Sequence, residues 1–211
     1  MTIAVIDYGM GNLRSVSKAL EHVAPGARVE VTSDPAAVAR AERVVFPGQG
    51  AMPDCMREMD ARNLRQAVLD AARTKPFLGI CIGLQMLFES SEEGDVTGLA
   101  VLPGRVRRFP ANAMRDERGA KLKVPHMGWN QVRQARPHPL WAGIEDGERF
   151  YFVHSYFAEA ASDDLTCGVT VYGFPFTCAV AKDNIFAVQF HPEKSHNAGL
   201  RLLANFVDWN S

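Results

Sequence analysis

The chain has 211 residues, of which 47% are hydrophobic and 22% are charged, and its formal net charge is −1 at pH 7. This length and composition predict a single domain, residues 1–211, with a substantial core and no linker or repeat. The near-neutral charge gives no overall field for nucleic acid or an acidic membrane surface, and no apolar run approaches the roughly 20 residues of a membrane-spanning helix.

The start of the chain and its cysteines favour a reducing compartment. Met1 leads directly into a strand pattern, without the basic region of a secretion signal. The four cysteines, Cys55, Cys81, Cys167 and Cys178, form no Cys-x-x-Cys pair, so we expect neither a disulfide framework nor a zinc site. We therefore expect a cytoplasmic protein that needs no metal.

The first half of the chain alternates between strand and helix patterns. Short apolar runs predict strands at residues 3–7, 29–32, 43–46 and 77–80. Helical periodicity, such as the stripe of Leu13, Val16 and Leu20, predicts helices at residues 12–23, 53–59, 64–72 and 84–90. This order predicts an α/β fold with a doubly wound, largely parallel sheet.

The second half is richer in strands and turns, which indicates antiparallel additions to the sheet. Strand patterns cover residues 101–109, 150–153, 166–172, 177–181 and 185–190, and a final helix is predicted at residues 195–209. The basic stretch at residues 105–123 contains acidic residues, and it predicts a solvated hairpin with its tip near Gly119.

Two features that could suggest cofactors do not meet the requirements for them. Gly9 and Gly11 follow the first strand as in a dinucleotide loop, but Arg14 occupies the third glycine position and no phosphate lysine follows. We therefore predict no cofactor. Five histidines lack the i, i+4 spacing of a helical metal site and are interpreted as hydrogen-bonding or surface residues: His22, His126, His138, His154 and His196.

Cys81 lies between a predicted strand and a predicted helix, with Gly79 and Gly83 two residues to either side. This spacing is typical of a nucleophile elbow, in which a strained turn exposes the nucleophile and flanking side chains would crowd it. At the first turn of the following helix, the positive end of the helix dipole would also favour the thiolate form of Cys81 over the thiol. A lone cysteine in an apolar stretch is otherwise a common core residue.

His191 and Glu193 follow the predicted strand at residues 185–190, with proline between them. In an extended segment, residues i and i+2 point to the same side, so the carboxylate can lie beside the imidazole ring. A base and its orienting carboxylate are the remaining members of a catalytic triad. Without the elbow, the same tripeptide would be read as a surface turn.

The segment Gly48-Gln49-Gly50 follows a third predicted strand. Acyl transfer needs backbone N–H groups close to the developing oxyanion, and glycine permits that approach. We expect the oxyanion hole to combine the N–H of Ile82 with one from this segment. The motif alone also fits a tight turn that closes a strand.

These motifs resemble those of the triad (class I) glutamine amidotransferases. The resemblance rests first on residues 79–85 (GICIGLQ) and 189–195 (QFHPEKS). Three further motifs resemble the glutaminase subunits of imidazole glycerol phosphate synthases, namely residues 7–13 (DYGMGNL), 125–130 (PHMGWN) and 152–156 (FVHSY). The match extends from the first strand to the last helix.

The resemblance implies a glutaminase that acts on L-glutamine. Cys81 would attack the side-chain amide carbon, His191 would pass the thiol proton to the departing ammonia, and Glu193 would orient the imidazole. Water would hydrolyse the resulting thioester to glutamate. The substrate's amino acid head would be held by Gln85, by the backbone around Ser155 and Tyr156, and by the charge of Glu93.

The chain has parts to release ammonia but no second domain to use it, so another chain should supply the acceptor site. The resemblance implies that the heterodimer partner is a (β/α)8-barrel synthase subunit, which makes imidazole glycerol phosphate and aminoimidazole carboxamide ribotide in histidine biosynthesis. The same likeness implies a partner interface formed by Asn12, Trp129, Tyr151 and Lys194, although Trp129 would also suit a core position.

Three alternatives stay open at this point. The same triad could serve another amidotransferase, such as those of anthranilate or pyridoxal phosphate synthesis. The chain could also be a non-catalytic regulatory subunit, although an intact Cys81, His191 and Glu193 argues against this. A cysteine peptidase is less consistent with Gln85, which suits a small amide.

Overall fold

The computed structural model describes residues 1–110 and 114–210. Within them, twelve strands form one sheet, in which ten follow the order β2-β1-β3-β4-β14-β13-β11-β7-β5-β6, β12 pairs with β13, and β9 pairs with β12. Strands β8 and β10 form a separate pair. The strands are β1 (Thr2–Ile6), β2 (Arg28–Thr32), β3 (Arg43–Gly48), β4 (Phe77–Cys81), β5 (Phe88–Ser91), β6 (Val96–Thr97), β7 (Leu102–Arg108), β8 (His126–Gln131), β9 (Arg133–Gln134), β10 (Arg149–His154), β11 (Tyr156–Ala160), β12 (Thr166–Tyr172), β13 (Phe174–Lys182) and β14 (Ile185–Val188).

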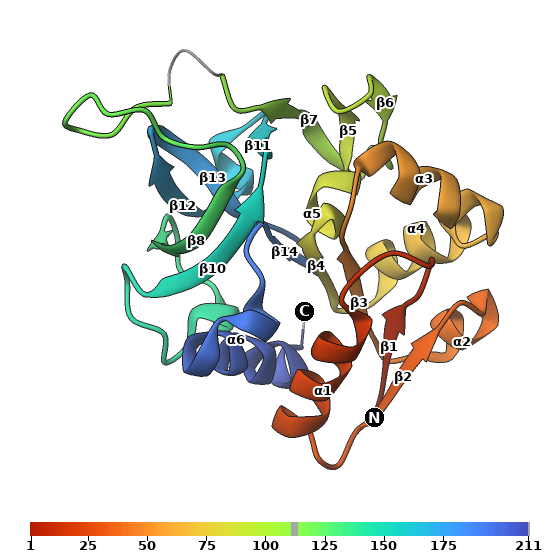
Figure 1. The fold of residues 1–211 in the computed structure, drawn as a ribbon. Helices are drawn as coiled ribbons and strands as arrows, with labels where there is room; N and C mark the ends of the chain where they lie inside the picture. The colour runs from red at the N-terminus through yellow and green to blue at the C-terminus, as the bar shows by residue number, and fades with distance from the viewer. Residues whose placement is uncertain (111–113, 211) are drawn as a thin grey trace.

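Helices cover both faces of the parallel half of the sheet. They are α1 (Leu13–Val23), α2 (Pro35–Arg40), α3 (Met52–Ala61), α4 (Arg65–Thr74), α5 (Ile82–Met86) and α6 (His196–Asp208), with the 3-10 helices η1 (Pro139–Trp141), η2 (Asp163–Leu165) and η3 (Pro192–Lys194). Helices α1 and α6 lie side by side on one face, and α2, α3 and α4 lie toward the other (Figure 1). The strand order β2-β1-β3 reverses direction at β1, and right-handed crossovers are then expected to place helices on both faces of the sheet.

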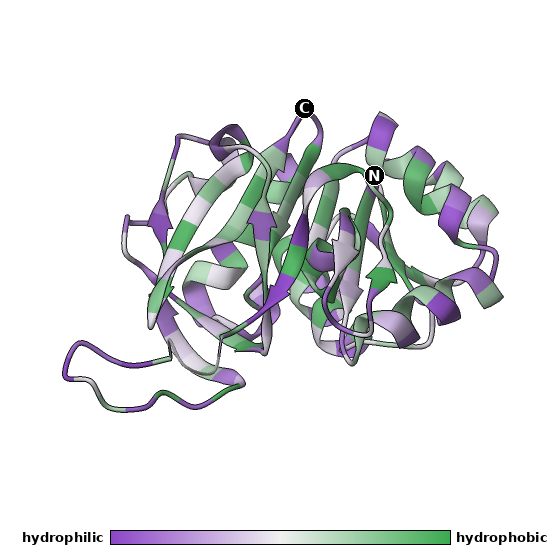
Figure 2. Ribbon diagram, turned by 90° about the horizontal axis from the view of Figure 1, so that it is seen from above, coloured by the Kyte–Doolittle hydropathy of each residue, from purple (hydrophilic) through white to green (hydrophobic). Residues whose placement is uncertain are grey.

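The strands β2, β1, β3, β4 and β14 are parallel neighbours, and β3, β4 and β14 are buried along their whole length. Burial on both faces explains why these segments read as continuous apolar runs. Figure 2 shows hydrophobic residues along the central strands and hydrophilic ones on the outer sides of the helices. On α1, Val16 and Leu20 of the predicted stripe are fully buried.

The second half adds antiparallel strands, because β13 pairs antiparallel with β14, β11 and β12. An aromatic cluster fills the space under these strands, where Phe109 packs on Phe157, Phe174 and Phe176 at centroid distances of 5.2, 6.0 and 5.3 Å. The predicted fold class, a largely parallel sheet with antiparallel additions, is confirmed.

The predicted helix at residues 84–90 is wrong beyond Met86. Strand β5 begins at Phe88, because backbone N–H groups of the later segment 99–101 take the carbonyls that a longer helix would use. Leu99 donates to Met86 at 2.8 Å and Ala100 donates to Phe88 at 3.1 Å. Helix α2 was not predicted from the sequence; Asp34 caps it by accepting a hydrogen bond from the N–H of Ala36 at 2.9 Å.

The predicted hairpin at residues 105–123 is confirmed only around its tip. Arg115 pairs with Lys121, and Gly119 lies between them with φ of +82°. Residues 105–108 belong to β7 in the main sheet, and residues 111–113 lie outside the described residues. Among the helices of the described ranges, none combines the length and the apolar character that a membrane crossing requires.

Candidate active site

Cys81 ends β4 and caps α5 with an unusual backbone conformation, φ +56° and ψ −109°. Non-glycine residues rarely adopt it, and such strain is concentrated at functional sites. The two flanking glycines are needed, because a Cβ on Gly83 would lie 1.8 Å from the carbonyl oxygen of Phe46, and one on Gly79 would lie 2.9 Å from the Cβ of Ala187. The predicted elbow geometry is therefore present.

Three neighbouring strands end beside Cys81. On one side Gly48 is its register partner, and on the other Val188 pairs with Ile80, so that Gln189 comes directly beside the cysteine. The carboxyl ends of parallel strands form the usual ligand-binding edge of such sheets. The sheet register thus brings the predicted nucleophile next to the loops that follow β3 and β14.

His191 and Glu193 are paired and buried. The Nδ1 of His191 lies 2.8 Å from the Oε1 of Glu193, and their side chains are only 2% and 1% exposed. His191 is extended, with φ −104° and ψ 95°, but Pro192–Lys194 form the 3-10 helix η3, so the expected extended segment does not continue to Glu193. The main-chain N–H of His191 donates to the Tyr151 carbonyl at 2.9 Å and Ser195 Oγ donates to the His191 carbonyl at 2.6 Å, which fixes the turn.

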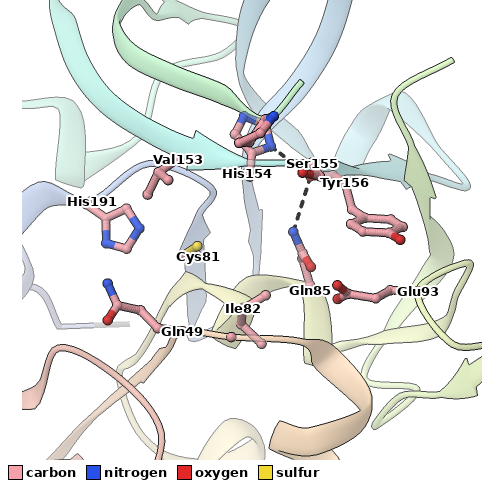
Figure 3. A pocket seen from close by; sticks show the side chains of 12 residues that line it. Gln49, Cys81, Ile82, Gln85, Glu93, Val153, His154, Ser155, Tyr156 and His191 are labelled. Atoms are coloured by element: carbon pink, nitrogen blue, oxygen red, sulfur yellow. Dashed lines mark hydrogen bonds between the residues drawn. The ribbon is translucent and has the colours of Figure 1, made fainter. Parts of the chain in front are cut away.

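The His191 ring faces Cys81 across the cavity (Figure 3). Its Nε2 has no hydrogen-bond partner in the described part of the chain. Burial disfavours the imidazolium, but the negative charges of Cys81 and Glu193 outweigh it and raise the pKa of His191 to about 10. A ring with this pKa is protonated at pH 7, so it can deliver a proton from Nε2 and take one back.

A cavity of about 370 Å³ opens over this pair, which is in the range of small-molecule sites. Its walls are Gln49, Gly50, Cys81, Ile82, Gln85, Glu93, Pro125, Val153, His154, Ser155, Tyr156 and His191. Nine of the predicted site residues are among them. Two predicted catalytic-site residues, Gly48 and Glu193, are not in the walls. Gly48 packs against Ile82, since a Cβ added to Gly48 would lie 2.8 Å from the Cβ of Ile82. Glu193 lies behind the His191 ring, bonded to its Nδ1.

Gln85 and Glu93 are both held by the surrounding backbone. The Nε2 of Gln85 donates to the Tyr156 carbonyl at 3.2 Å, while its Oε1 is buried without a partner among the described residues. The carboxylate of Glu93 accepts a hydrogen bond from the N–H of Met52 at 2.8 Å. The cavity therefore has the carboxylate of Glu93 in its wall, and the amide oxygen of Gln85 lies buried behind the wall.

Sequence reasoning missed the contributions of His154, Val153 and Pro125 to the cavity wall. The first two come directly before Ser155, so the neighbouring motif was the available signal. His154 is buried. Burial lowers the pKa of its ring to about 3, although the ring also forms a hydrogen bond to the Tyr156 carbonyl. The ring is therefore neutral at pH 7.

Three of the four predicted interface residues form one surface cluster. Trp129 is 42% exposed, and the centroid of its ring lies 6.0 Å from that of the Tyr151 ring. The Nζ of Lys194 also lies 6.0 Å from the centroid of the Tyr151 ring. His196 stacks on Trp129 at 4.9 Å. Asn12 is the N-cap of α1, where its side chain makes no capping hydrogen bond, and α1 contacts the helix η3 that carries Lys194.

The described residues contain no group of three or more His, Cys, Asp or Glu side chains placed to hold a metal ion. The chemistry that these residues offer in the cavity is that of the cysteine, the histidine–carboxylate pair and the backbone N–H groups.

A family model for glutamine amidotransferase class-I matches residues 4–209. The chain belongs to this family. Class-I amidotransferase relatives cover almost its whole length: it is 72% identical over 208 residues to the imidazole glycerol phosphate synthase subunit HisH of Thiobacillus denitrificans, covering 99% of the chain and 91% of that protein. It is 70% identical over 207 residues to the HisH subunit of Nitrosospira multiformis, covering 98% and 97%.

Solved structures share the fold at lower identity. The structure of PurLQS from Thermotoga maritima has a TM-score of 0.70 at 19% identity and covers 98% of this chain and 97% of that one. A glutamine amidotransferase from Thermotoga maritima has a TM-score of 0.63 at 16% identity and covers 99% and 83%. At these identities the likeness concerns the class-I amidotransferase fold alone.

Proposed function

We propose that the chain is the glutaminase subunit of an imidazole glycerol phosphate synthase, acting in histidine biosynthesis. The observation that carries the proposal is the position of Cys81 on a strained elbow, facing a histidine whose other nitrogen is 2.8 Å from a buried carboxylate. The high identity to proteins named as HisH subunits supports the choice of pathway.

The reaction begins when the sulfur of Cys81 attacks the side-chain amide carbon of glutamine. The amide oxygen takes up the electron pair and is stabilised by the N–H of Ile82 and one from the segment 48–50. His191 holds the thiol proton and delivers it to the amide nitrogen as the C–N bond breaks, releasing ammonia. Glu193 keeps the ring oriented and offsets the charge of the imidazolium.

The second half of the cycle hydrolyses the thioester. Water adds to the thioester carbonyl and gives a proton to His191; the C–S bond then breaks, and the sulfur leaves with its electron pair as glutamate forms. The same base and the same oxyanion donors therefore serve both steps, as covalent catalysis requires.

Recognition of glutamine falls to groups on the far wall of the cavity. The carboxylate of Glu93 accepts hydrogen bonds from a ligand ammonium, the side chain of Gln85 lines the cavity with it, and the backbone of Ser155 and Tyr156 supplies further polar groups. A cavity with these acceptors suits a small amino acid better than an extended peptide.

The ammonia passes to a (β/α)8-barrel synthase subunit, with which the chain forms a heterodimer in the cytoplasm. Support for a partner surface comes from the cluster of Trp129, Tyr151 and Lys194, because an exposed aromatic ring beside a cation is typical of interface anchors. Glutaminase activity is low in the isolated chain and rises when the loaded partner rearranges the segment 48–50.

The test is glutamate production by wild type and Cys81→Ala, each with the barrel partner and its nucleotide ligand. Wild type should turn over and the variant should lose essentially all activity. Cys167→Ala is the matched control, since that cysteine is also buried but contacts Trp141 away from the cavity. Activity in Cys81→Ala would contradict the mechanism, and equal wild-type rates without the partner would contradict the activation.

A further inference from the structure

Gln189 is a fully buried polar residue that the proposed reaction does not use. It follows β14, one residue beyond the pairing of Val188 with Ile80, so the parallel register brings it beside Cys81. Its side-chain Nε2 lies 3.7 Å from the sulfur of Cys81, within the range of an N–H···S hydrogen bond. A side-chain N–H of Gln189 therefore points at the sulfur of Cys81.

A chain of hydrogen bonds fixes which end of that amide faces the sulfur. The Oε1 of Gln189 accepts a hydrogen bond from the Nε2 of Gln85 at 2.9 Å, and this leaves only the Nε2 of Gln189 for Cys81. Gln85 is held in turn, because its Nε2 also donates to the carbonyl of Tyr156 at 3.2 Å. Both amides are thus locked in one orientation.

Two buried histidines support the same carbonyl. The Nδ1 of His154 lies 2.7 Å from the Tyr156 oxygen, which can only accept, so this nitrogen carries the proton. The Nε2 of His154 is then an acceptor, and the Nδ1 of His126, 2.9 Å away, donates to it. Burial lowers the pKa of His126 to about 4, so the pair stays neutral near pH 7. The chain of donors runs in one direction, from His126 to the Tyr156 carbonyl.

We propose that Gln189 is a further catalytic residue, which donates a side-chain N–H to the sulfur of Cys81 whenever the sulfur carries negative charge. The inference rests on the proposed glutaminase function. The hydrogen bond favours the thiolate before attack and is lost as the sulfur forms the thioester bond. It forms again during hydrolysis, when the C–S bond breaks and the electron pair returns to sulfur.

The direct test measures the rate at which iodoacetamide alkylates Cys81 at pH 7, followed by peptide mass spectrometry. Gln189→Leu has nearly the same size but no donor, and we expect alkylation to slow about tenfold, as for the loss of one charged hydrogen bond. Gln134→Leu is the matched control, since its Nε2 donates to Ile144 at 2.8 Å away from the cavity, and its rate should equal that of wild type. An equal rate in folded Gln189→Leu would overturn the inference.

The kinetic test separates this role from substrate binding. Gln189 does not line the cavity, and without it Gln85 keeps its hydrogen bond to the Tyr156 carbonyl, so Gln189→Leu should lower kcat about tenfold with a smaller change in KM, whereas Gln85→Leu should mainly raise KM. A rise in KM with unchanged kcat for Gln189→Leu would refute a role at the sulfur.

Should Gln189→Leu fail to fold, Gln189→Met is unbranched like glutamine, has nearly the same size, and has neither an N–H to donate nor a charge. Alkylation at pH 7 should again be slower than in wild type, and a wild-type rate would overturn the inference. Because alkylation needs no glutamine, an inactive wild type with a preserved alkylation difference would refute the proposed function without touching the role of Gln189.

Discussion

Replacing Gly83 with alanine tests whether the elbow must be built from glycine. The added Cβ would lie 1.8 Å from the carbonyl oxygen of Phe46. Phe46 is fully buried in the central strand β3 and cannot withdraw, so α5 must move. Lengthening the contact from 1.8 Å to 3.0 Å requires a displacement of about 1.2 Å, which moves the N–H of Ile82 and the side chain of Gln85 with it.

A misplacement of about 1 Å in a catalytic group lowers activity by about 100-fold, and overpacking destabilises by about 1–3 kcal/mol. We therefore expect Gly83→Ala to lose about 100-fold in partner-stimulated glutamate production and to unfold at lower urea concentration. The assay is glutamate release at saturating glutamine, together with urea unfolding followed by circular dichroism.

Two other glycines give a graded control. At Gly79 the nearest atom to an added Cβ is the Ala187 Cβ at 2.9 Å, so Gly79→Ala should have a smaller effect. At Gly26 nothing lies within 4 Å, so Gly26→Ala should match wild type. Wild-type activity and stability in Gly83→Ala would refute the steric reasoning.

Three further predictions concern the histidine–carboxylate pair, the end of β3 and the partner surface. Glu193→Gln removes a charge that favours the imidazolium, so it should lower the pKa of His191 from about 10, as measured by NMR titration of the ring; an unchanged value would contradict the pairing. In wild type, the stabilisation from the raised pKa should be complete below about pH 6.5 and be lost as the pH rises through about 10. Tyr8→Phe leaves the Pro47 carbonyl without its 2.8 Å donor and should lower the free energy of unfolding by about 1–3 kcal/mol; an unchanged urea midpoint would argue against this. Trp129→Ala should weaken binding of the barrel partner by about 2 kcal/mol in calorimetry, and an unchanged Kd would exclude Trp129 as an anchor.

Local chemistry made the central part of the site predictable from sequence. The elbow at Cys81 was predictable because the glycine spacing has a steric cause, which the 1.8 Å approach of Phe46 to Gly83 makes explicit. The pairing of His191 with Glu193 was also predicted, although the chain turns into the 3-10 helix η3 after His191 and does not stay extended as far as Glu193. The strands β3, β4 and β14 were predictable because each is an apolar run buried on both faces.

Contacts between distant segments were not predictable. The helical pattern at residues 84–90 did not reveal that the carbonyls of Met86 and Phe88 bond to residues 99 and 100. Gln189 was predicted only as part of a strand. Its position beside Cys81 depends on the register of β14 on β4, which the sequence does not reveal. His154 was predicted as a hydrogen-bonding or surface residue, but its position in the cavity wall was not predicted, because its partner His126 comes from the distant strand β8.

The most direct test of the central claim is covalent labelling with an electrophilic glutamine analogue. Peptide mass spectrometry of the labelled protein should find the adduct on Cys81, and excess glutamine should prevent it from forming. Labelling at another residue, or labelling of Cys81 that glutamine does not slow, would contradict the account that this sulfur attacks glutamine in the cavity beside His191.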